Sequence, residues 1–402
     1  MFKVDYGNPL QVAAMWSNLV EPGDNAAGLL TGVLGQAKGL EWVLESADPK
    51  ELPSELVADT EGRKLPWRQA IQRWLPRVAE ANIEQQFEYL QRLGGRLMYP
   101  QHPDWPGQLN DLGEYAPLAL WMRGNFELAQ PREWVSLVGA RASTNLGDQL
   151  AAELSFDLVN AGFGVVSGGA FGIDTAAHRG ALTVASQVSS EALATIAFMA
   201  GGVGQLYPAS QLDLFNRLLD VGLVVSEVPP SWRPARWRFL SRNRLIAAFS
   251  AATVVVEAGV RSGALATAHR ALELGRPVGA VPGPVTSQMS FGCHQLIREC
   301  GVTLVTNAQQ VGELFLGLGA GLTGGALASE GVQSELVFVS DDFNNPVHER
   351  VWLALPKYGE ATFVSVAKVA GLSVSEVSAA VSALLVAGKV EVFGDKCRRI
   401  YS

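Results

Sequence analysis

Arginines and aromatic side chains alternate in one short stretch of the sequence, residues 228–256. The stretch contains no Asp or Glu, although the net charge of the whole chain is −8. Its arginines and the aromatic residues interleaved with them are Trp232, Arg233, Arg236, Trp237, Arg238, Phe239, Arg242 and Arg244. Arginines neutralise phosphates, and flat rings stack on splayed bases with about 1–3 kcal/mol per base. The stretch therefore predicts binding of single-stranded nucleic acid, although the tryptophans could also be core residues and the arginines could pair with distant carboxylates.

Two glycine-containing segments have the composition of phosphate-binding loops. Arg141 follows an apolar run, and Ser143 or Thr144 can cap the helix expected after it. This places Arg141 beside a helix N-terminus, where a phosphate can be held. The segment Ser167–Asp174 has three glycines that open another helix, and their backbone N–H groups can form an anion-binding nest.

The second loop argues against a dinucleotide cofactor. Ser167 occupies the first glycine position of the dinucleotide fingerprint, and the next apolar run, Ala194–Met199, is not followed by an acid. His178 lies four residues after Asp174 and is expected to pair with it on a helix. The five histidines and three cysteines are scattered without metal-ligand spacing. We therefore expect neither a metal nor any other cofactor.

Glu257 is the residue on which an enzymatic alternative depends. It ends the apolar run Thr253–Val256, and a carboxylate at a strand end in an α/β protein is a catalytic candidate. It could equally cap a helix or pair with an arginine. The sequence has no G-x-S-x-G elbow and no Walker A motif, so we expect a protein that is not an enzyme.

The elements that position these loops follow from the hydrophobic pattern. Continuous apolar runs alternate with helical stretches such as Leu146–Asn160 and Ser262–Leu274. The runs are Trp134–Val138, Phe163–Val166, Ala194–Met199, Gly222–Val225, Thr253–Val256, Pro277–Val281 and Val302–Val305. This alternation predicts an α/β fold, an extended Rossmann-like, doubly wound and mostly parallel sheet, with ligands at the carboxyl ends of its strands.

The domain organisation is expected to have four parts. Residues 1–95 show helical periodicity and predict an N-terminal helical domain of the SAM or helix-hairpin type. Residues 96–310 form the Rossmann-like domain, and residues 311–345, rich in Gly, Ala, Ser and Val, form a linker. Residues 346–402 predict three helices and a hairpin, the pattern of a winged-helix domain.

Several motifs resemble the DprA/Smf family of DNA-processing proteins, in order and at family-like spacing over about residues 95–305. The specific part is the string Ser167-Gly168-Gly169-Ala170-Phe171-Gly172-Ile173-Asp174, which continues to His178. Val138-Gly139-Ala140-Arg141, Tyr207-Pro208, Arg242-Asn243-Arg244 and Ala280-Val281-Pro282-Gly283 support it. His294 stands where the family often has Asn, and the proline usual before the Arg-Asn-Arg string is missing.

The resemblance implies a single-stranded DNA-binding protein that self-associates as a homodimer. It also implies protection of incoming strands and loading of a RecA-type recombinase in natural transformation. The residues predicted to bind DNA are Arg141, Ser167, Gly168, Gly169, Phe171, Arg238, Phe239, Arg242, Asn243 and Arg244.

Two alternatives belong to other functional classes. The fold is shared with phosphoribohydrolases, in which a glycine-rich loop and a strand-end glutamate cleave an N-glycosidic bond, and Glu257 could take that part. A protein-interaction module is the other alternative. An odd number of cysteines and an N-terminus without an apolar signal region favour the cytoplasm, with no membrane partner.

Overall fold

The computed structural model describes residues 4–57, 67–126, 133–187, 194–316, 346–356, 359–370 and 372–400. The chain divides into two compact units, residues 1–328 and residues 329–402.

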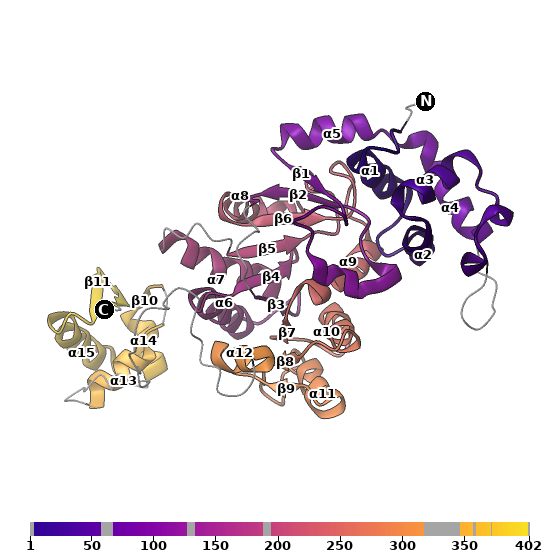
Figure 1. The fold of residues 1–402 in the computed structure, drawn as a ribbon. Coiled ribbons are helices and arrows are strands. Elements are labelled where there is room, and N and C mark those ends of the chain that lie inside the picture. The colour runs from indigo at the N-terminus through magenta and orange to yellow at the C-terminus, as the bar shows by residue number, and fades with distance from the viewer. Residues whose placement is uncertain are drawn as a thin grey trace, which may run out of the picture. The chain divides into compact units, whose positions relative to one another are not determined.

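The first unit is built on a nine-stranded sheet (Figure 1). Its strands are β1 (Arg96–Met98), β2 (Leu120–Gly124), β3 (Trp134–Val138), β4 (Gly164–Gly168), β5 (Thr195–Phe198), β6 (Leu223–Ser226), β7 (Ala252–Val255), β8 (Val278–Ala280) and β9 (Thr303–Leu304). The spatial order is β1-β2-β6-β5-β4-β3-β7-β8-β9. All neighbours from β6 to β9 are parallel, whereas β2 is antiparallel to both β1 and β6. The expected α/β fold with a mostly parallel sheet is confirmed, and the order reverses at β3 and β7.

Helices cover both faces of this sheet. One face carries α6 (Asn145–Asn160), α7 (Ile173–Gln187), α8 (Leu212–Val221) and α12 (Ala308–Leu316), and the other carries α9 (Arg236–Phe249), α10 (Gly263–Glu273) and α11 (Phe291–Cys300). The pleat explains the burial of both faces, because alternate residues of a strand point in opposite directions. In β3, Val135 and Leu137 pack with α6, whereas Trp134 and Val138 pack with the layer of α9.

The N-terminal helices share a hydrophobic core with one end of the sheet. They are α1 (Pro9–Leu19), α2 (Asn25–Leu34), α3 (Gln36–Glu45), α4 (Trp67–Glu80) and α5 (Ile83–Arg92). Trp16 and Trp74 pack edge to face with their ring centroids 5.9 Å apart. Trp121 of β2 lies in the same core and donates from Nε1 to Ser17 Oγ at 3.1 Å. Short 3₁₀ segments add Pro49–Glu51, Ser54–Leu56, Gly107–Tyr115 and Ala209–Gln211.

The described residues of the second unit form three helices and a three-stranded antiparallel sheet. The elements are α13 (Pro346–Ala354), β10 (Ala361–Thr362), α14 (Phe363–Ala370), α15 (Val374–Val386), β11 (Val390–Phe393) and β12 (Lys396–Arg399). The sheet order is β10-β12-β11. Helix α12 occupies the start of the segment expected as a linker, and the rest of that segment, residues 317–345, lies outside the described residues.

Candidate nucleic-acid interface

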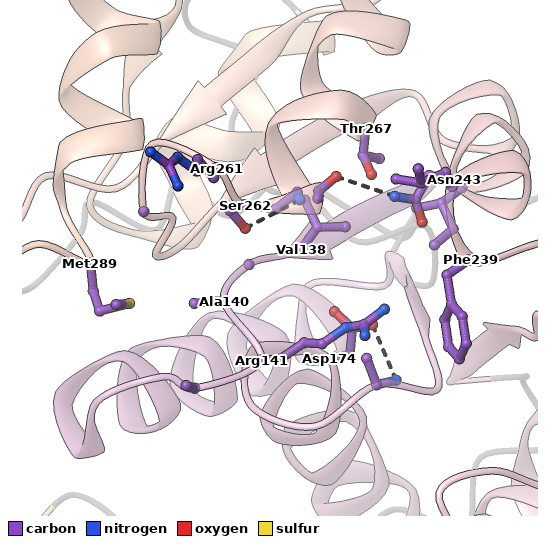
Figure 2. A pocket seen from close by; sticks show the side chains of 18 of the residues that line it. Val138, Ala140, Arg141, Asp174, Phe239, Asn243, Arg261, Ser262, Thr267 and Met289 are labelled. Carbon is purple, nitrogen blue, oxygen red and sulfur yellow. Dashed lines mark hydrogen bonds between the residues drawn. The ribbon is translucent and has the colours of Figure 1, made fainter. Parts of the chain in front are cut away.

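A cavity of about 1130 Å³ opens at the carboxyl ends of β3 and β7 (Figure 2). This is the place where the strand order reverses, and open α/β sheets bind ligands at such a position. The loop after β3 supplies residues 139–142, the loop after β7 supplies residues 259–263, and α9 forms a third wall. The lining contains four arginines, Arg141, Arg236, Arg242 and Arg261, against a single acid, Asp174. The cavity therefore carries a net positive charge, which suits a phosphate-bearing ligand.

Local sequence explains why two helices begin at this cavity. Thr144 caps α6, because its side chain accepts from Gly147 N at 3.0 Å, and Ser262 caps α10 by accepting from Ala264 N at 3.3 Å. The expected cap at Ser143 or Thr144 is thus found at Thr144. Gly263 and Ala264 line the cavity, so the positive end of the α10 dipole lies at its wall.

Arg141 and two aromatic rings form a stacked group in the cavity. The guanidinium of Arg141 lies 4.7 Å from the ring centroid of Phe239, and the ring of Tyr207 packs edge to face on Phe239 at 6.1 Å. Figure 2 shows Arg141 pointing toward Phe239, with Arg261 and Met289 on the other side of the view. Arg141 is exposed and Tyr207 is 48% exposed. A flat base has both an aromatic face and a cation available here.

Arg242 lies at the buried side of the cavity beside the glycine loop. It is 5% exposed, donates to the carbonyl of Phe198, and donates from Nε to Asn243 Oδ1 at 3.1 Å. Burial lowers the pKa of Arg242 to about 10, so the guanidinium stays protonated at neutral pH. A Cβ at position 168 would lie 2.1 Å from Arg242 Nη1, so a larger residue there would require this guanidinium to move.

Asp174 is the one acidic residue among those that line the cavity, and Arg242 is near it. Burial raises the pKa of its carboxyl, and the nearby Arg242 opposes that rise. Its Oδ2 accepts from Ala170 N at 3.3 Å. The expected pair between Asp174 and His178 is wrong, because both ring nitrogens of His178 have other partners. Nδ1 lies 2.8 Å from Thr195 Oγ1, and Nε2 lies 2.8 Å from the carbonyl oxygen of Gly168. Burial lowers the pKa of His178 to about 4, so the ring is neutral and structural.

Two predicted DNA-contact residues face carboxylates instead of the cavity. Arg238 donates to Glu21 from Nε at 2.8 Å and from Nη2 at 2.9 Å. Arg244 makes a bidentate pair with Glu227 at 2.6 and 2.5 Å and also donates to Tyr115 O at 2.8 Å. Both arginines are less than a tenth exposed. The pairing with distant carboxylates, considered above as an alternative, is therefore what the structure shows at these two positions.

The glycine loop contributes mainly by packing. Ser167 is fully buried and donates from Oγ to Leu137 O at 2.6 Å. Gly172 has φ +74°, and a Cβ there would meet the carbonyl of Ala140 at 2.2 Å. Phe171 is 45% exposed but lines a separate hollow of about 520 Å³ between α6 and α7. Gly169 is buried against Met199. The structure thus places Gly168 beside Arg242 but keeps Phe171 apart from Phe239.

Tyr207, Arg236 and Arg261 also line the cavity and are not among the DNA-contact residues predicted from the sequence. Arg261 follows β7 by a few residues, so the rule that ligands meet the carboxyl ends of strands could have identified it. Asn243, which the sequence predicted to bind DNA, lines the cavity and donates from Nδ2 to Gly263 O at 3.2 Å.

Glu257 has a structural role at the start of α6. Its two carboxylate oxygens accept from Thr144 N at 2.9 Å and from Thr144 Oγ1 at 2.6 Å. It is 8% exposed and is not among the residues that line the cavity. A Cβ at Gly147 would lie 2.3 Å from this carboxyl. The geometry therefore matches helix capping, the non-catalytic alternative named above for this residue.

Within the described residues, His, Cys, Asp and Glu form no group of three that could hold a metal ion. The cysteines Cys293, Cys300 and Cys397 are free. None of the helices that the structure describes is long and apolar enough to cross a membrane.

Comparison with known proteins identifies relatives of this chain. A model of the DNA recombination-mediator protein A family matches residues 96–315. A protein of Mycobacterium tuberculosis that bears the name DprA is 39% identical over 364 residues, which cover 88% of each chain. The DNA processing protein DprA of Streptococcus pneumoniae is 38% identical over 208 residues, 52% of this chain and 70% of that protein. An X-ray structure of DprA from Streptococcus pneumoniae superposes with a TM-score of 0.57 and 28% identity, covering 77% of this chain and 98% of that one. Since the family model spans more than half of the residues, this chain belongs to the DNA recombination-mediator protein A family.

Proposed function

We propose that this protein binds single-stranded DNA in the cavity at β3 and β7 and acts as a non-catalytic DNA-processing protein. The observation that carries the proposal is the stacked group of Arg141, Phe239 and Tyr207 inside a cavity with four arginines. A single strand exposes both its phosphates and the faces of its bases, whereas a duplex hides the base faces. The names of the relatives, DNA processing protein DprA, point to the same class of ligand.

The DNA-contact residues that we propose divide into two groups. Arg141, Phe239, Arg242 and Asn243 line the cavity and contact the strand directly. The other predicted residues lie outside the cavity lining and act indirectly, namely Ser167, Gly168, Gly169, Phe171, Arg238 and Arg244. For Arg238 and Arg244 a further reason is that each would have to give up a carboxylate partner in order to bind a phosphate.

The proposed absence of catalysis is supported by the position of Glu257. Both of its oxygens are engaged by Thr144, so the carboxylate that a phosphoribohydrolase-type reaction would need is already bonded. No nucleotide turnover is expected. AMP hydrolysis that disappears in Glu257→Gln would contradict the proposal.

We further propose that the protein passes its strand to a RecA-type recombinase during transformation and works as a cytoplasmic homodimer. The family description as a recombination mediator supports the first part, and the free cysteines fit a reducing compartment. Strand exchange by a RecA-type protein, measured with and without this chain, tests the first part. Light scattering tests the dimer.

The second unit is proposed to be a winged-helix domain. The order of its elements, helix, strand, two helices and a β11–β12 hairpin, supports this assignment. The three domains and the linker, with the boundaries given above, remain part of the proposal. Removal of residues 329–402 should leave binding to single strands unchanged if the cavity alone holds the strand.

Fluorescence anisotropy across a salt series tests the main proposal, with labelled single-stranded and duplex oligonucleotides. Binding should favour the single strand and fall steeply with salt, because each phosphate contact releases counterions. Arg141→Ala should weaken binding, whereas Arg217→Ala, an exposed arginine of α8 outside the cavity, should not. Equal binding by wild type and Arg141→Ala would place the strand elsewhere.

A further inference from the structure

A second group of arginines and tryptophans lies where the start of α9 meets the N-terminal helices. We name it the tryptophan surface, and it consists of Arg77, Trp232, Arg233 and Trp237. Trp232 lies between two guanidinium groups, Arg77 at 5.5 Å and Arg238 at 4.7 Å from its ring centroid. Trp237 is 59% exposed, which is unusual for so large an apolar ring. The surface therefore combines an available ring with a high density of cations.

The charges on this surface do not cancel. Arg77 and Arg238 share one carboxylate, Glu21, at 2.6 and 2.8 Å. Burial raises the pKa of Glu21, but hydrogen bonds from Arg238 and Arg77 outweigh burial and lower the pKa to about 2. Arg233 and Arg236 are exposed, and neither forms an ion pair with any residue in the described part of the chain. The surface is left with an excess of positive charge.

The tryptophan surface is continuous with the cavity. Pro234, Arg236 and Leu240 line the cavity, and Leu240 lies one helical turn after Trp237 on the same side of α9. Leu240 is 62% exposed, so no other described segment covers the boundary between the tryptophan surface and the cavity.

The opposite exit from the cavity, past the glycine loop, is less suited to a phosphate backbone. The hollow there contains Arg179 together with Asp148, whose charges offset each other. Of these two exits, the one on the α9 side is therefore the one that carries net positive charge.

We propose that single-stranded DNA leaving the cavity crosses the first turn of α9 and stacks one base on Trp237, while its phosphates contact Arg233 and Arg236. This inference rests on the proposed function and extends it, because it makes the binding site longer than the cavity. An indole offers a stacking face to any base, so this part of the site has no sequence preference. Tight binding then requires an oligonucleotide long enough to reach both places.

The test uses oligo-dT of two lengths, about 4 and about 16 nucleotides, the limits of site sizes for small single-strand-binding folds. The full-length protein should bind the longer oligonucleotide more tightly. Trp237→Ala and Arg233→Ala should each lower affinity for the longer one by about fivefold or more and leave the shorter one unchanged. Trp237→Phe keeps a stacking ring and should retain most of the affinity.

A measurement without substitutions gives independent evidence. Photocross-linking with 5-iodouracil near one end of the longer oligonucleotide should label Trp237, as mapped by mass spectrometry. If the variants lost affinity equally for the two oligonucleotide lengths, or for neither, the inference would be overturned, and DNA binding in the cavity would be unaffected. Changed self-association with unchanged DNA binding would assign the surface to a second copy of the chain. Failure of the wild type to bind either oligonucleotide would instead reject the proposed function itself.

Discussion

The two sides of α9 use the same residue type for opposite purposes. On the side of the cavity, Arg236, Phe239 and Asn243 are spaced three and four residues apart and line an open space. To either side of that row, Arg238 and Arg244 are buried in ion pairs with Glu21 and Glu227.

This difference shows that a count of arginines overstates the charge available to a ligand. Glu227 immediately precedes the basic stretch 228–256, and Glu21 lies more than two hundred positions away in the chain. Two arginines therefore hold the N-terminal helices and the 3₁₀ segment Gly107–Tyr115 against α9.

The largest expected effect is on stability, from Arg244→Ala. The change leaves the Glu227 carboxylate buried without its partner, and removal of one member of a buried pair costs about 3–5 kcal/mol. Urea unfolding measures this loss. The double replacement of Arg244 by Met and Glu227 by Leu should recover much of it. Full stability of the single variant, together with weaker DNA binding, would move Arg244 to the functional side of the comparison.

The next effect is on binding, from Phe239→Ala. Loss of the ring removes the support of the Arg141 guanidinium and one stacking face, which is expected to cost about 1–3 kcal/mol of binding free energy. Anisotropy titration with a single-stranded oligonucleotide measures it. The free energy of unfolding should change far less than in Arg244→Ala, since Phe239 is only partly buried. A reversed order of the two effects would refute the division between the two sides of α9.

The third effect is a pH dependence of stability, which arises from the ion pairs of Glu21 with Arg77 and Arg238. The pKa of Glu21 is lowered from 4.5 to about 2, so its ionised form binds Arg238 and Arg77 only in the folded state. Its contribution to stability is complete above about pH 5 and is lost as the pH falls from there toward 2. Thermal unfolding across this pH range should show that Glu21→Gln loses less stability on acidification than the wild type does. Parallel curves for the two proteins would rule out this linkage.

The smallest effect is expected for Arg261→Ala, which should change how the affinity for single-stranded DNA depends on salt. The exposed Arg261 lines the cavity without stacking on a ring, so it is expected to contact one phosphate. Its loss should reduce the slope of log affinity against log salt by about 0.7, the value for one phosphate of a single strand. Arg217→Ala serves as the matched control and should leave the slope unchanged.

Much of the central fold was predictable because its signals are local. Each of the seven predicted strands is present, and the limits of Trp134–Val138 agree with β3. The antiparallel strands β1 and β2 were missed, because β1 is three residues long and pairs only with β2. Of the residues predicted to bind DNA, Arg141, Phe239, Arg242 and Asn243 line the cavity.

Residues whose partners are distant in the chain were the ones that sequence could not place. Nothing near Arg238 indicates that Glu21 will approach it from the loop between α1 and α2. His178 was assigned to Asp174 by helical spacing, but the sheet brings Thr195 and the carbonyl of Gly168 closer.

The sequence by itself determined the alternation of strands and helices, the glycine loop and the concentration of arginines and rings in one segment. These follow from steric and hydrophobic periodicities that act within a few residues. Only the tertiary structure decided which arginines are neutralised and which remain open to a ligand. A guanidinium is free or paired according to the carboxylates that packing brings within a few ångströms, and that depends on how distant segments bury their apolar faces together.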